Sequence, residues 1–412
     1  MLAHGAENLP AFNALPEHKE LPDPFVMMDG ARVITAQEWN EKRRPELKQL
    51  FQHYMYGYAP EPVPIHSELE TPETEILGGN GVLRQVVISF PTLPEHAPRI
   101  HLALFLPKAA NGPVPVFIAM NKCGNYTVLD DEAILIDPTA YVHDQCPGPP
   151  ETARGKDKDF WCVPYLVERG YAFATYHESN IDPDKDDFTD GIHPFFPDLK
   201  CPDESRWGTI AAWAWGIQRC VDYLASAPGI DKGKICVTGH SRRGKTALLA
   251  GAFDERIALV VPHQSGTGGA ALSRDNDQET VERINRVFPH WFNDVYPKFG
   301  SGNEAKLPMD QHLLMALVAP RPLLDTMGLQ DKWANYDSSL RAIHAAAPVW
   351  ALLGGKGMVG DGVLTDPQEV AKENAGSLLQ YRRDTKHTMD QGYWKAILDF
   401  ADIQFGRVSA VR

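Results

Sequence analysis

The sequence predicts an α/β protein in which a mostly parallel central sheet is flanked by helices, as a three-layer sandwich. Short apolar runs alternate with helical patterns from about residue 114 onward, which is typical of strand–helix–strand units. Two alternating stretches, Val82–Phe90 and His101–Leu106, come earlier and favour an antiparallel pair at one edge. Finally, Lys234–Ala250 passes from an apolar run through a glycine-flanked serine into good helix formers.

The N-terminal part of the chain reads as an extension that wraps the sheet. Residues 1 to about 30 are proline-rich and irregular, and Thr35–Tyr58 carries apolar side chains at helical spacing. Thr35 is a suitable N-cap for this helix and Gly57 a suitable stop. We therefore expect one catalytic domain over residues 1–412, with residues 1–80 as its N-terminal extension.

The remaining elements follow from apolar runs and helical periodicity. Strands are expected at Val114–Met120, Tyr171–Tyr176, Ile257–Val261, Pro322–Met327 and Val349–Leu352, and helices at Val163–Arg169, Ser205–Ala225, Gln278–Val287, Asp310–Leu317, Tyr336–Ala346 and Asp390–Phe405. Two long connections, 121–161 and 177–204, are of a length that usually has a function. The acidic run IDPDKDDF in the second does not fit a calcium-binding loop, and we expect a solvated loop there.

Composition narrows the classes of partner. The net charge of −14 disfavours nucleic acid and anionic membrane surfaces, and no apolar run approaches the roughly 20 residues that span a bilayer. No secretory signal is visible at the N-terminus. Among the six cysteines, Cys236 is expected as a buried thiol, whereas those in loop-like stretches allow one or two disulfides if the protein is exported: Cys123, Cys146, Cys162 and Cys201.

The segment GHSRRG has the form of a nucleophile elbow. A strand, a sharp turn and a helix would hold the Ser241 hydroxyl above the sheet edge, and small residues are needed at Gly239 and Gly244 because strand and helix approach closely. The alternative is an ordinary turn that contains a serine. The strand before it and the helix after it favour the elbow, and with it the α/β-hydrolase fold.

A serine nucleophile needs a base and a carboxylate, which in this fold follow it in the order acid, then histidine. His387 lies on a loop before the closing helix, where the base is expected. The acid is expected beyond the end of a strand, which favours Asp331 over Asp325, since Asp325 falls inside the apolar run. A Ser-His-Asp triad of this kind needs no metal and no organic cofactor.

Two basic residues follow the serine. The backbone N–H of Arg242 is placed to donate to an oxyanion, and its guanidinium would add charge-assisted stabilisation. The alternative for Arg242 is a solvent-exposed arginine. Lys245, one turn further, faces the same side as Ser241, and would contact substrate hydroxyls or pair with a surface acid.

These motifs resemble the glucuronoyl esterases of carbohydrate esterase family 15, especially their bacterial branch. The resemblance covers most of the chain from about residue 25, and Ser-Arg-x-x-Lys in the elbow is more specific than G-x-S-x-G alone. The segments that carry it are GHSRRGK around Ser241, ESRWGTIAAWAWG at 204–216, HQSGTGGAALSR at 263–274, ETVERINRVFPHWF at 279–292, DQHLLMALVAPRPLL at 310–324, DKWAN at 331–335 and the loop of His387.

The resemblance implies hydrolysis of the ester between (4-O-methyl)glucuronic acid of glucuronoxylan and a lignin alcohol. By match, Ser241 is the nucleophile, His387 the base and Arg242 the oxyanion stabiliser. The positions matched to sugar binding are Lys245, Glu279 and Trp333, with Glu282 a competitor for Glu279 and a buried core indole the alternative for Trp333. The family also implies a secreted or periplasmic protein, and we expect a monomer that binds neither nucleic acid nor membrane.

One position departs from the pattern of many family members. They carry the triad acid as Glu in an E-S-G run, where this chain reads Gln264-Ser265-Gly266. Glutamine supplies no negative charge, which strengthens the assignment of Asp331. Two alternatives to the glucuronoyl esterase remain: an acetyl or feruloyl esterase of xylan on the same fold, and a weakly catalytic protein that mainly binds glucuronoxylan.

Overall fold

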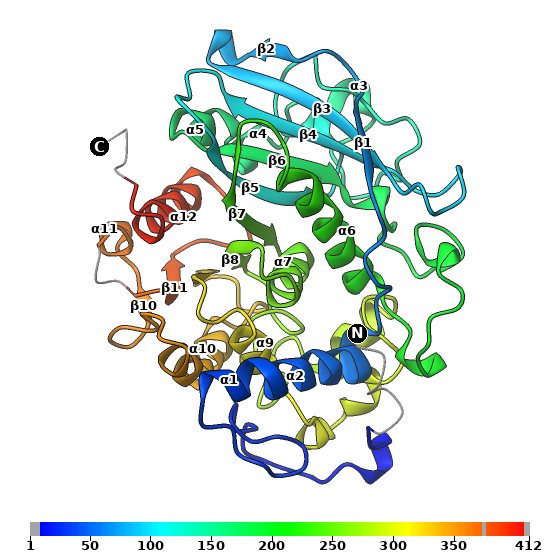
Figure 1. Cartoon of the computed structure of the whole chain (residues 1–412), viewed down its shortest axis with the longest axis vertical. Coiled ribbons are helices and arrows are strands. Elements are labelled where there is room, and N and C mark those ends of the chain that lie inside the picture. The colour runs from blue at the N-terminus through cyan, green and yellow to red at the C-terminus, as the bar shows by residue number, and fades with distance from the viewer. Residues whose placement is uncertain (1–8, 373–375, 408–412) are drawn as a thin grey trace.

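A single mixed sheet organises the molecule, and the computed structural model describes residues 9–372 and 376–407 of the chain (Figure 1). Its strands follow the spatial order β1-β3-β4-β6-β5-β7-β8-β9-β11-β10, with β2 paired to β3. Their bounds are β1 His66–Leu69, β2 Thr74–Ile76, β3 Gly81–Ser89, β4 Ile100–Pro107, β5 Val114–Asn121, β6 Ala172–His177, β7 Ile230–His240, β8 Ile257–His263, β9 Leu323–Gly328, β10 Val363–Leu364 and β11 Leu378–Arg383.

The sheet has an antiparallel end and a parallel end. Strands β1, β2, β3, β4 and β6 pair antiparallel, whereas every pairing from β6 through β5, β7, β8, β9 and β11 to β10 is parallel. The antiparallel pair predicted from the alternating stretches is therefore confirmed. Because the carboxyl ends of the parallel strands meet at one edge, loops from distant parts of the chain converge there.

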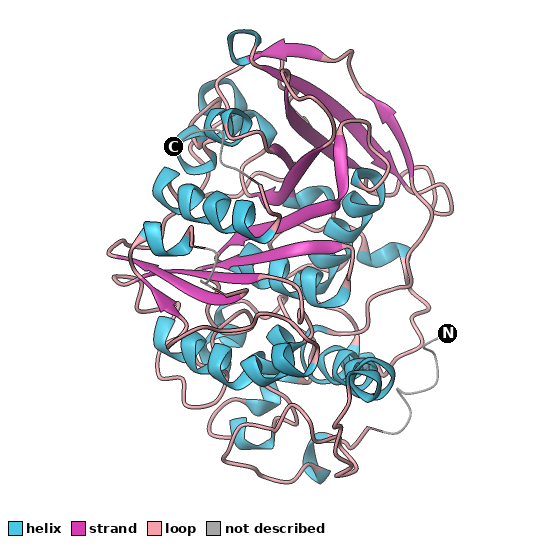
Figure 2. Ribbon diagram, turned by 60° about the vertical axis from the view of Figure 1, so that its left-hand side comes forward, coloured by secondary structure: helices cyan, strands magenta, loops and turns pink. Residues whose placement is uncertain are grey.

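Helices cover both faces of the sheet (Figure 2). Side chains of β5 alternate between two cores: Val116 and Ile118 pack with α6, α7, α9 and α10, while Phe117 and Ala119 pack with α4, α5 and α12. The helices are α1 Ala36–Glu38, α2 Arg44–Phe51, α3 Pro150–Ala153, α4 Lys158–Trp161, α5 Val163–Glu168, α6 Thr209–Leu224, α7 Arg242–Phe253, α8 Val281–Val287, α9 Gln311–Ala316, α10 Tyr336–Leu352, α11 Pro367–Val370 and α12 Gln391–Gln404. No helix in the described part of the chain has both the length and the apolar character to cross a bilayer.

The predicted N-terminal helix is present as a continuous run, Ala36–Tyr56, in which α1 and α2 alternate with π-helical turns. The Thr35 hydroxyl accepts a hydrogen bond from the N–H of Glu38, as expected of an N-cap, and Gly57 ends the run with φ of +86°. The helix packs its apolar face on the core beside α9, and Arg44 donates to the carbonyls of Leu317 and Ala319. This segment thus covers the part of the core next to α9.

Three expectations were wrong. Val349–Leu352 is the end of α10 and not a strand, because the helix continues through Pro348. The last long strand before the closing helix is instead β11, whose polar residues hid it from an apolar-run criterion. The acidic loop after β6 is not solvated throughout, since Asp182 and Asp184 are buried.

Candidate active site

The turn between β7 and α7 has the geometry of a nucleophile elbow. Ser241 adopts φ of +60° and ψ of −126°, a strained conformation for a residue with a side chain, and its N–H donates to the His263 carbonyl at 2.9 Å. A Cβ at Gly239 would lie 2.2 Å from the Arg243 carbonyl oxygen, and one at Gly244 would lie 2.7 Å from the Gly239 oxygen. Both glycines are therefore required by close approach, and the serine is held at the carboxyl edge of the sheet.

Asp331 and His387 meet at this edge. Nδ1 of His387 lies 2.6 Å from Oδ2 of Asp331, although 56 residues separate them in the chain. The Asp331 side chain is 5% exposed, and that of His387 is 41% exposed. An N–H at Nδ1 that donates to the carboxylate leaves Nε2 to accept a proton. Within the described residues, Ser241 and His387 form no direct hydrogen bond, a separation common in sites without substrate.

Residues at the end of β8 hold the loop that carries His387. Nε2 of His263 donates to the Thr388 carbonyl at 2.8 Å, and the Gln264 amide donates to the Lys386 carbonyl and accepts from the Thr388 N–H. Burial lowers the pKa of His263 to about 3, so this imidazole stays neutral. Gln264 therefore occupies the position of the alternative acid but clamps the loop through its amide.

A neutral histidine also packs against His387. The ring of His240 lies 4.1 Å from that of His387, measured between centroids, with an interplanar angle of 45°. Burial lowers the pKa of His240 well below its ordinary value, and the charge of His387 acts in the same direction. This contact gives the His387 ring a buried, uncharged neighbour on one side.

The side chain of Arg242, the residue after the serine, lies in a compact cage. Its guanidinium sits 4.6 Å from the ring centre of Phe288 and 4.4 Å from that of Trp291, and Nη1 donates to Asp184. Asp184 also accepts from Nε2 of His290 at 3.0 Å and from the Trp291 indole at 2.9 Å. The Arg242 side chain is 14% exposed, so its charge is kept in place and partly open to the site.

The same carboxylate is held ionised. Burial alone would raise the pKa of Asp184, but the hydrogen bond from His290 and the charges of Arg242 and Arg243 outweigh it, and the pKa lies well below its ordinary range. Arg243 points the other way and pairs with the buried Glu178, to which its Nη2 donates at 2.7 Å. The two adjacent arginines therefore have separate counter-ions.

The three positions matched to sugar binding form one connected group. Nζ of Lys245 donates to Oε2 of Glu279 at 3.0 Å and to the carbonyls of Ser265 and Thr267, while Oε1 of Glu279 accepts from the Trp333 indole at 2.7 Å. Lys245 is 2% exposed and Glu279 3% exposed, so the counter-ion of Lys245 is a buried acid and not a surface one. Trp333 is half-buried, and the Arg283 guanidinium lies 4.2 Å from its ring centre.

The two competing acids lie elsewhere. Glu282 is exposed and accepts from the Ser301 hydroxyl. Asp325 is fully buried within β9, where Gln380 donates to it at 2.8 Å, and burial raises its pKa to about 6. Neither lies against the described side chains of Ser241 or His387.

Sequence analysis missed the cage around Arg242. Asp184 was assigned to a solvated acidic loop, and Phe288, His290 and Trp291 appeared only as part of the matched segment 279–292. The pairing of aromatic residues with one buried acid depends on two loops that are more than a hundred residues apart, and no local pattern marks it.

The long connection after β5 is fastened beside the site. Cys123 and Cys146 form a disulfide, while Cys162, Cys201 and the buried Cys236 are free thiols. Lys122, next to the bridge, donates to the side chain of Gln145 at 2.6 Å. One of the disulfides allowed by the sequence is thus present.

Comparison with known proteins places these features in a family. The family model "Glucuronyl esterase, fungi" matches residues 159–354. A carbohydrate esterase from an unknown prokaryotic organism is 39% identical over 389 residues, which cover 93% of this chain and 89% of that protein. The 4-O-methyl-glucuronoyl methylesterase of Phanerochaete carnosa is 29% identical over 344 residues, covering 81% of this chain and 72% of that protein.

Solved structures of esterases from the same family resemble this chain in fold. A promiscuous CE15 esterase from the marine bacterial metagenome superposes with a TM-score of 0.86 at 37% identity, over 95% of this chain and 98% of that one. The glucuronoyl esterase from Solibacter usitatus gives a TM-score of 0.85 at 33% identity, over 96% and 100%. The predicted α/β-hydrolase fold is therefore confirmed. Within that class, the chain belongs to carbohydrate esterase family 15, the glucuronoyl esterases.

Proposed function

We propose that this protein is a serine esterase that hydrolyses the ester between 4-O-methylglucuronic acid of glucuronoxylan and a lignin alcohol. The observation that carries the proposal is the bond between His387 and Asp331 at the same sheet edge as the strained Ser241. Its setting in a glucuronoyl esterase chain supplies the substrate class, because relatives such as that of Phanerochaete carnosa are 4-O-methyl-glucuronoyl methylesterases.

Catalysis proceeds by acyl transfer in two steps. Ser241 Oγ attacks the uronate ester carbonyl while its proton passes to Nε2 of His387, and Asp331 stabilises the resulting imidazolium through Nδ1. His387 then gives the proton to the departing alcohol oxygen. Water, deprotonated by the same imidazole, attacks the acyl-enzyme and releases the uronic acid. The exposed position of His387 gives the attacking water access.

Arg242 stabilises the negative charge that develops on the carbonyl oxygen. Its backbone N–H, at the first position of α7, is one donor, and the free donors of its guanidinium are a second source. Asp184 and the two aromatic rings prevent the guanidinium from turning into solvent, so little reorganisation is needed in the transition state.

The uronate ring is held by the connected group around Glu279. A carboxylate has about four acceptor sites, and three are used by Lys245, Trp333 and the Thr267 N–H, which leaves one for a sugar hydroxyl. Lys245 uses its three donors within the protein, so it acts by keeping Glu279 charged and in place. Trp333 offers an indole face to the ring. Export to an oxidising compartment accords with the Cys123–Cys146 bridge.

The test compares benzyl glucuronate with an aryl acetate as substrates. Wild type is expected to prefer the uronate ester in kcat/KM, and Ser241→Ala to lose activity on both. Ser226→Ala, which changes an exposed serine after α6, is the matched control and should leave both rates unchanged. If wild type preferred the acetate or a feruloyl ester, the proposed substrate would be wrong. If Ser241→Ala kept its activity, the proposed serine mechanism would be wrong. If wild type bound glucuronoxylan but hydrolysed no ester, the protein would be a carbohydrate-binding protein and not an esterase.

A further inference from the structure

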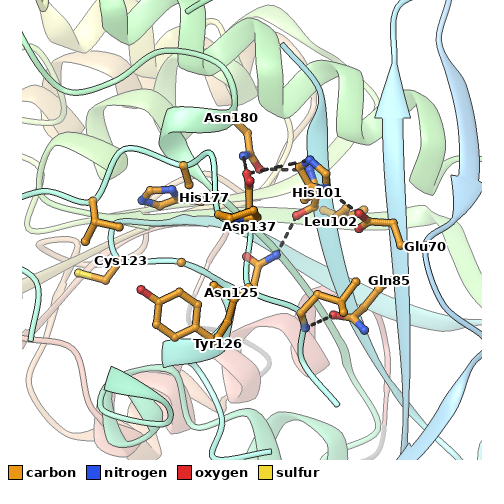
Figure 3. Close-up of a pocket in the computed structure, with 16 residues that line it drawn as sticks. Glu70, Gln85, His101, Leu102, Cys123, Asn125, Tyr126, Asp137, His177 and Asn180 are labelled. Carbon is orange, nitrogen blue, oxygen red and sulfur yellow. Dashed lines mark hydrogen bonds and ion pairs between the residues drawn. The ribbon is translucent and has the colours of Figure 1, made fainter. Parts of the chain in front are cut away.

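A second polar pocket lies at the carboxyl edge of the sheet, away from Ser241 (Figure 3). It has a volume of about 150 Å³ and is formed where β4 begins, where β5 and β6 end, and by the connection after β5. In the sheet order β7-β5-β6-β4 it lies one to three strand spacings from the elbow, roughly 5 to 14 Å. None of the residues assigned above to the reaction lines it.

The polar walls of the pocket are fixed by the protein itself. Asn180 donates to Asp137 at 2.9 Å and accepts from the His101 N–H, and Asn125 donates to the His101 carbonyl at 2.8 Å. Figure 3 shows these groups facing one another around the hollow. The loop that forms the outer wall ends at the Cys123–Cys146 bridge. A ligand would therefore meet a preformed site, with little ordering to be done on binding.

Two groups in the pocket, Nε2 of His101 and the second oxygen of Glu70, have hydrogen-bonding capacity left for a ligand. Nδ1 of His101 bonds to Oε1 of Glu70 at 2.6 Å, but its Nε2 lies 4.0 Å from Oδ2 of Asp137, which is too long for a hydrogen bond. Across the described chain, the second oxygen of Glu70 has no hydrogen-bond partner. The side chains of Glu70 and Asp137 are 18% and 14% exposed, and within the described residues neither forms an ion pair with a lysine or arginine. Asp137 already accepts hydrogen bonds from Thr139 and Asn180.

An apolar rim surrounds these groups. Leu135 and Val142 line the pocket and are 42% and 36% exposed, and Tyr141 beside them is 41% exposed. Large apolar side chains that stay exposed together on one loop are a common mark of a binding site. The pocket thus combines hydrogen-bonding groups on its inner wall with an apolar lip.

We propose that this pocket, defined by Glu70, His101 and Asp137, is a second carbohydrate-binding site that takes one neutral sugar ring. The hydrogen bond to Glu70 raises the pKa of His101 and so favours its protonated form, in which both ring nitrogens donate. One hydroxyl can then bridge the 4.0 Å gap, accepting from Nε2 of His101 and donating to Oδ2 of Asp137. A neighbouring hydroxyl donates to the second oxygen of Glu70. The C–H face of the ring then rests on the rim.

Charge and size restrict the ligand further. Two carboxylates and one imidazolium give the pocket a net negative charge, which disfavours the uronate that the active site is proposed to bind. Its volume is well below the 300 Å³ or more of typical ligand sites, which limits the occupant to about one ring. Naming that ring as a xylose of the glucuronoxylan backbone rests on the proposed function. The site would then hold the polysaccharide beside the elbow while the uronate side group reacts.

Ligand-observed saturation-transfer NMR with xylotriose tests the proposal without any ester turnover. Wild type is expected to bind xylotriose, and Glu70→Ala and Val142→Asp to raise its Kd at least tenfold. Glu369→Ala on α11 and Val359→Asp on the loop after α10 are matched controls outside the pocket and should bind like wild type. Trp333→Ala, which alters the proposed uronate site, should also leave the xylotriose Kd unchanged.

Other results would overturn the proposal. These are no transfer to xylotriose in wild type, an equal loss in Trp333→Ala, or a Glu70-dependent signal from glucuronic acid or coniferyl alcohol in place of xylotriose. Because xylotriose carries no ester, this outcome is independent of the benzyl glucuronate assay. The two assays therefore distinguish a protein that binds xylotriose but hydrolyses no uronate ester from one that hydrolyses the ester but does not bind xylotriose.

Discussion

The surroundings of His387 and of Arg242 are built in opposite ways. On the side of His387 the imidazole is 41% exposed and contacts the neutral ring of His240, while the neutral side chains of His263 and Gln264 hold the backbone of its loop. On the side of Arg242 the guanidinium is 14% exposed and the Asp184 carboxylate 1% exposed, within a cage of aromatic rings.

The difference follows from what each charge is proposed to do. A base must gain and lose a proton in every turnover, so its pKa has to stay near the working pH, and deep burial of the ring would lower it. An oxyanion donor must keep its charge and position throughout, which favours a buried counter-ion and rigid neighbours. The predictions below test this contrast between a relay side and an anion-stabilising side.

The relay side depends first on the charge of Asp331. Asp331→Asn keeps the shape but favours the wrong tautomer of His387, and kcat for the uronate ester is expected to fall about 10⁴-fold. Gln264→Ala removes only a clamp on the loop and should cost much less. Steady-state kinetics on benzyl glucuronate measures both, and comparable losses would show that the acid has been assigned to the wrong residue.

The anion-stabilising side depends on the Arg242 guanidinium. Arg242→Met keeps the backbone N–H and removes the side-chain donors, so kcat should fall roughly 10²- to 10³-fold with a smaller change in KM. Arg286→Met, at a position 68% exposed on α8, is the matched control and should behave as wild type. A change confined to KM would mean that Arg242 binds the ground state and does not stabilise the oxyanion.

Replacing Asp184 should lower kcat less than replacing Arg242 does, but it should lower the free energy of unfolding more. Asp184→Asn leaves the guanidinium against the stacked pair of Phe288 and Trp291 but without a counter-ion, and we expect kcat to fall about tenfold. Removing one partner of a buried pair costs about 3 to 5 kcal/mol of the free energy of unfolding. Urea unfolding together with kinetics checks both, and a variant as stable as wild type would contradict the buried pairing.

Lowering the pH should reduce the contributions of His263 and Asp184 to the free energy of unfolding in different pH ranges. The pKa of His263 is lowered to about 3, so the unfolded chain protonates first, and stability is full above its ordinary value of 6.5 and is lost as pH falls below it. Asp184 has a lowered pKa as well, and its contribution is lost only below its ordinary value of 3.8. His263→Gln should therefore flatten the decline below 6.5 by up to about 1.4 kcal/mol per pH unit, seen by urea unfolding. An unaltered slope would mean that His263 is not buried as a neutral ring.

Much of the site was accessible from local pattern. The elbow is a short motif whose glycines, serine and flanking elements are contiguous, so Ser241 and Arg242 could be chosen without knowing the fold. Chain order in this fold then narrowed fifteen histidines to His387 and favoured Asp331 over Asp325, because an acid inside an apolar strand faces a core. Prediction of the elements failed where burial and periodicity disagreed, as in β11, which is partly polar although most of it is buried.

The sequence by itself determined the strand–turn–helix at 234–250, the α/β order of elements and the identities of the groups at the elbow, because these depend on residues near one another in the chain. Only the tertiary structure decided which acid neutralises Arg242, that Gln264 clamps a loop, which cysteines pair and that Glu70, His101 and Asp137 enclose a pocket. Those features arise where loops from separate strands converge at one sheet edge, and each contact depends on the position of a segment far away in the sequence.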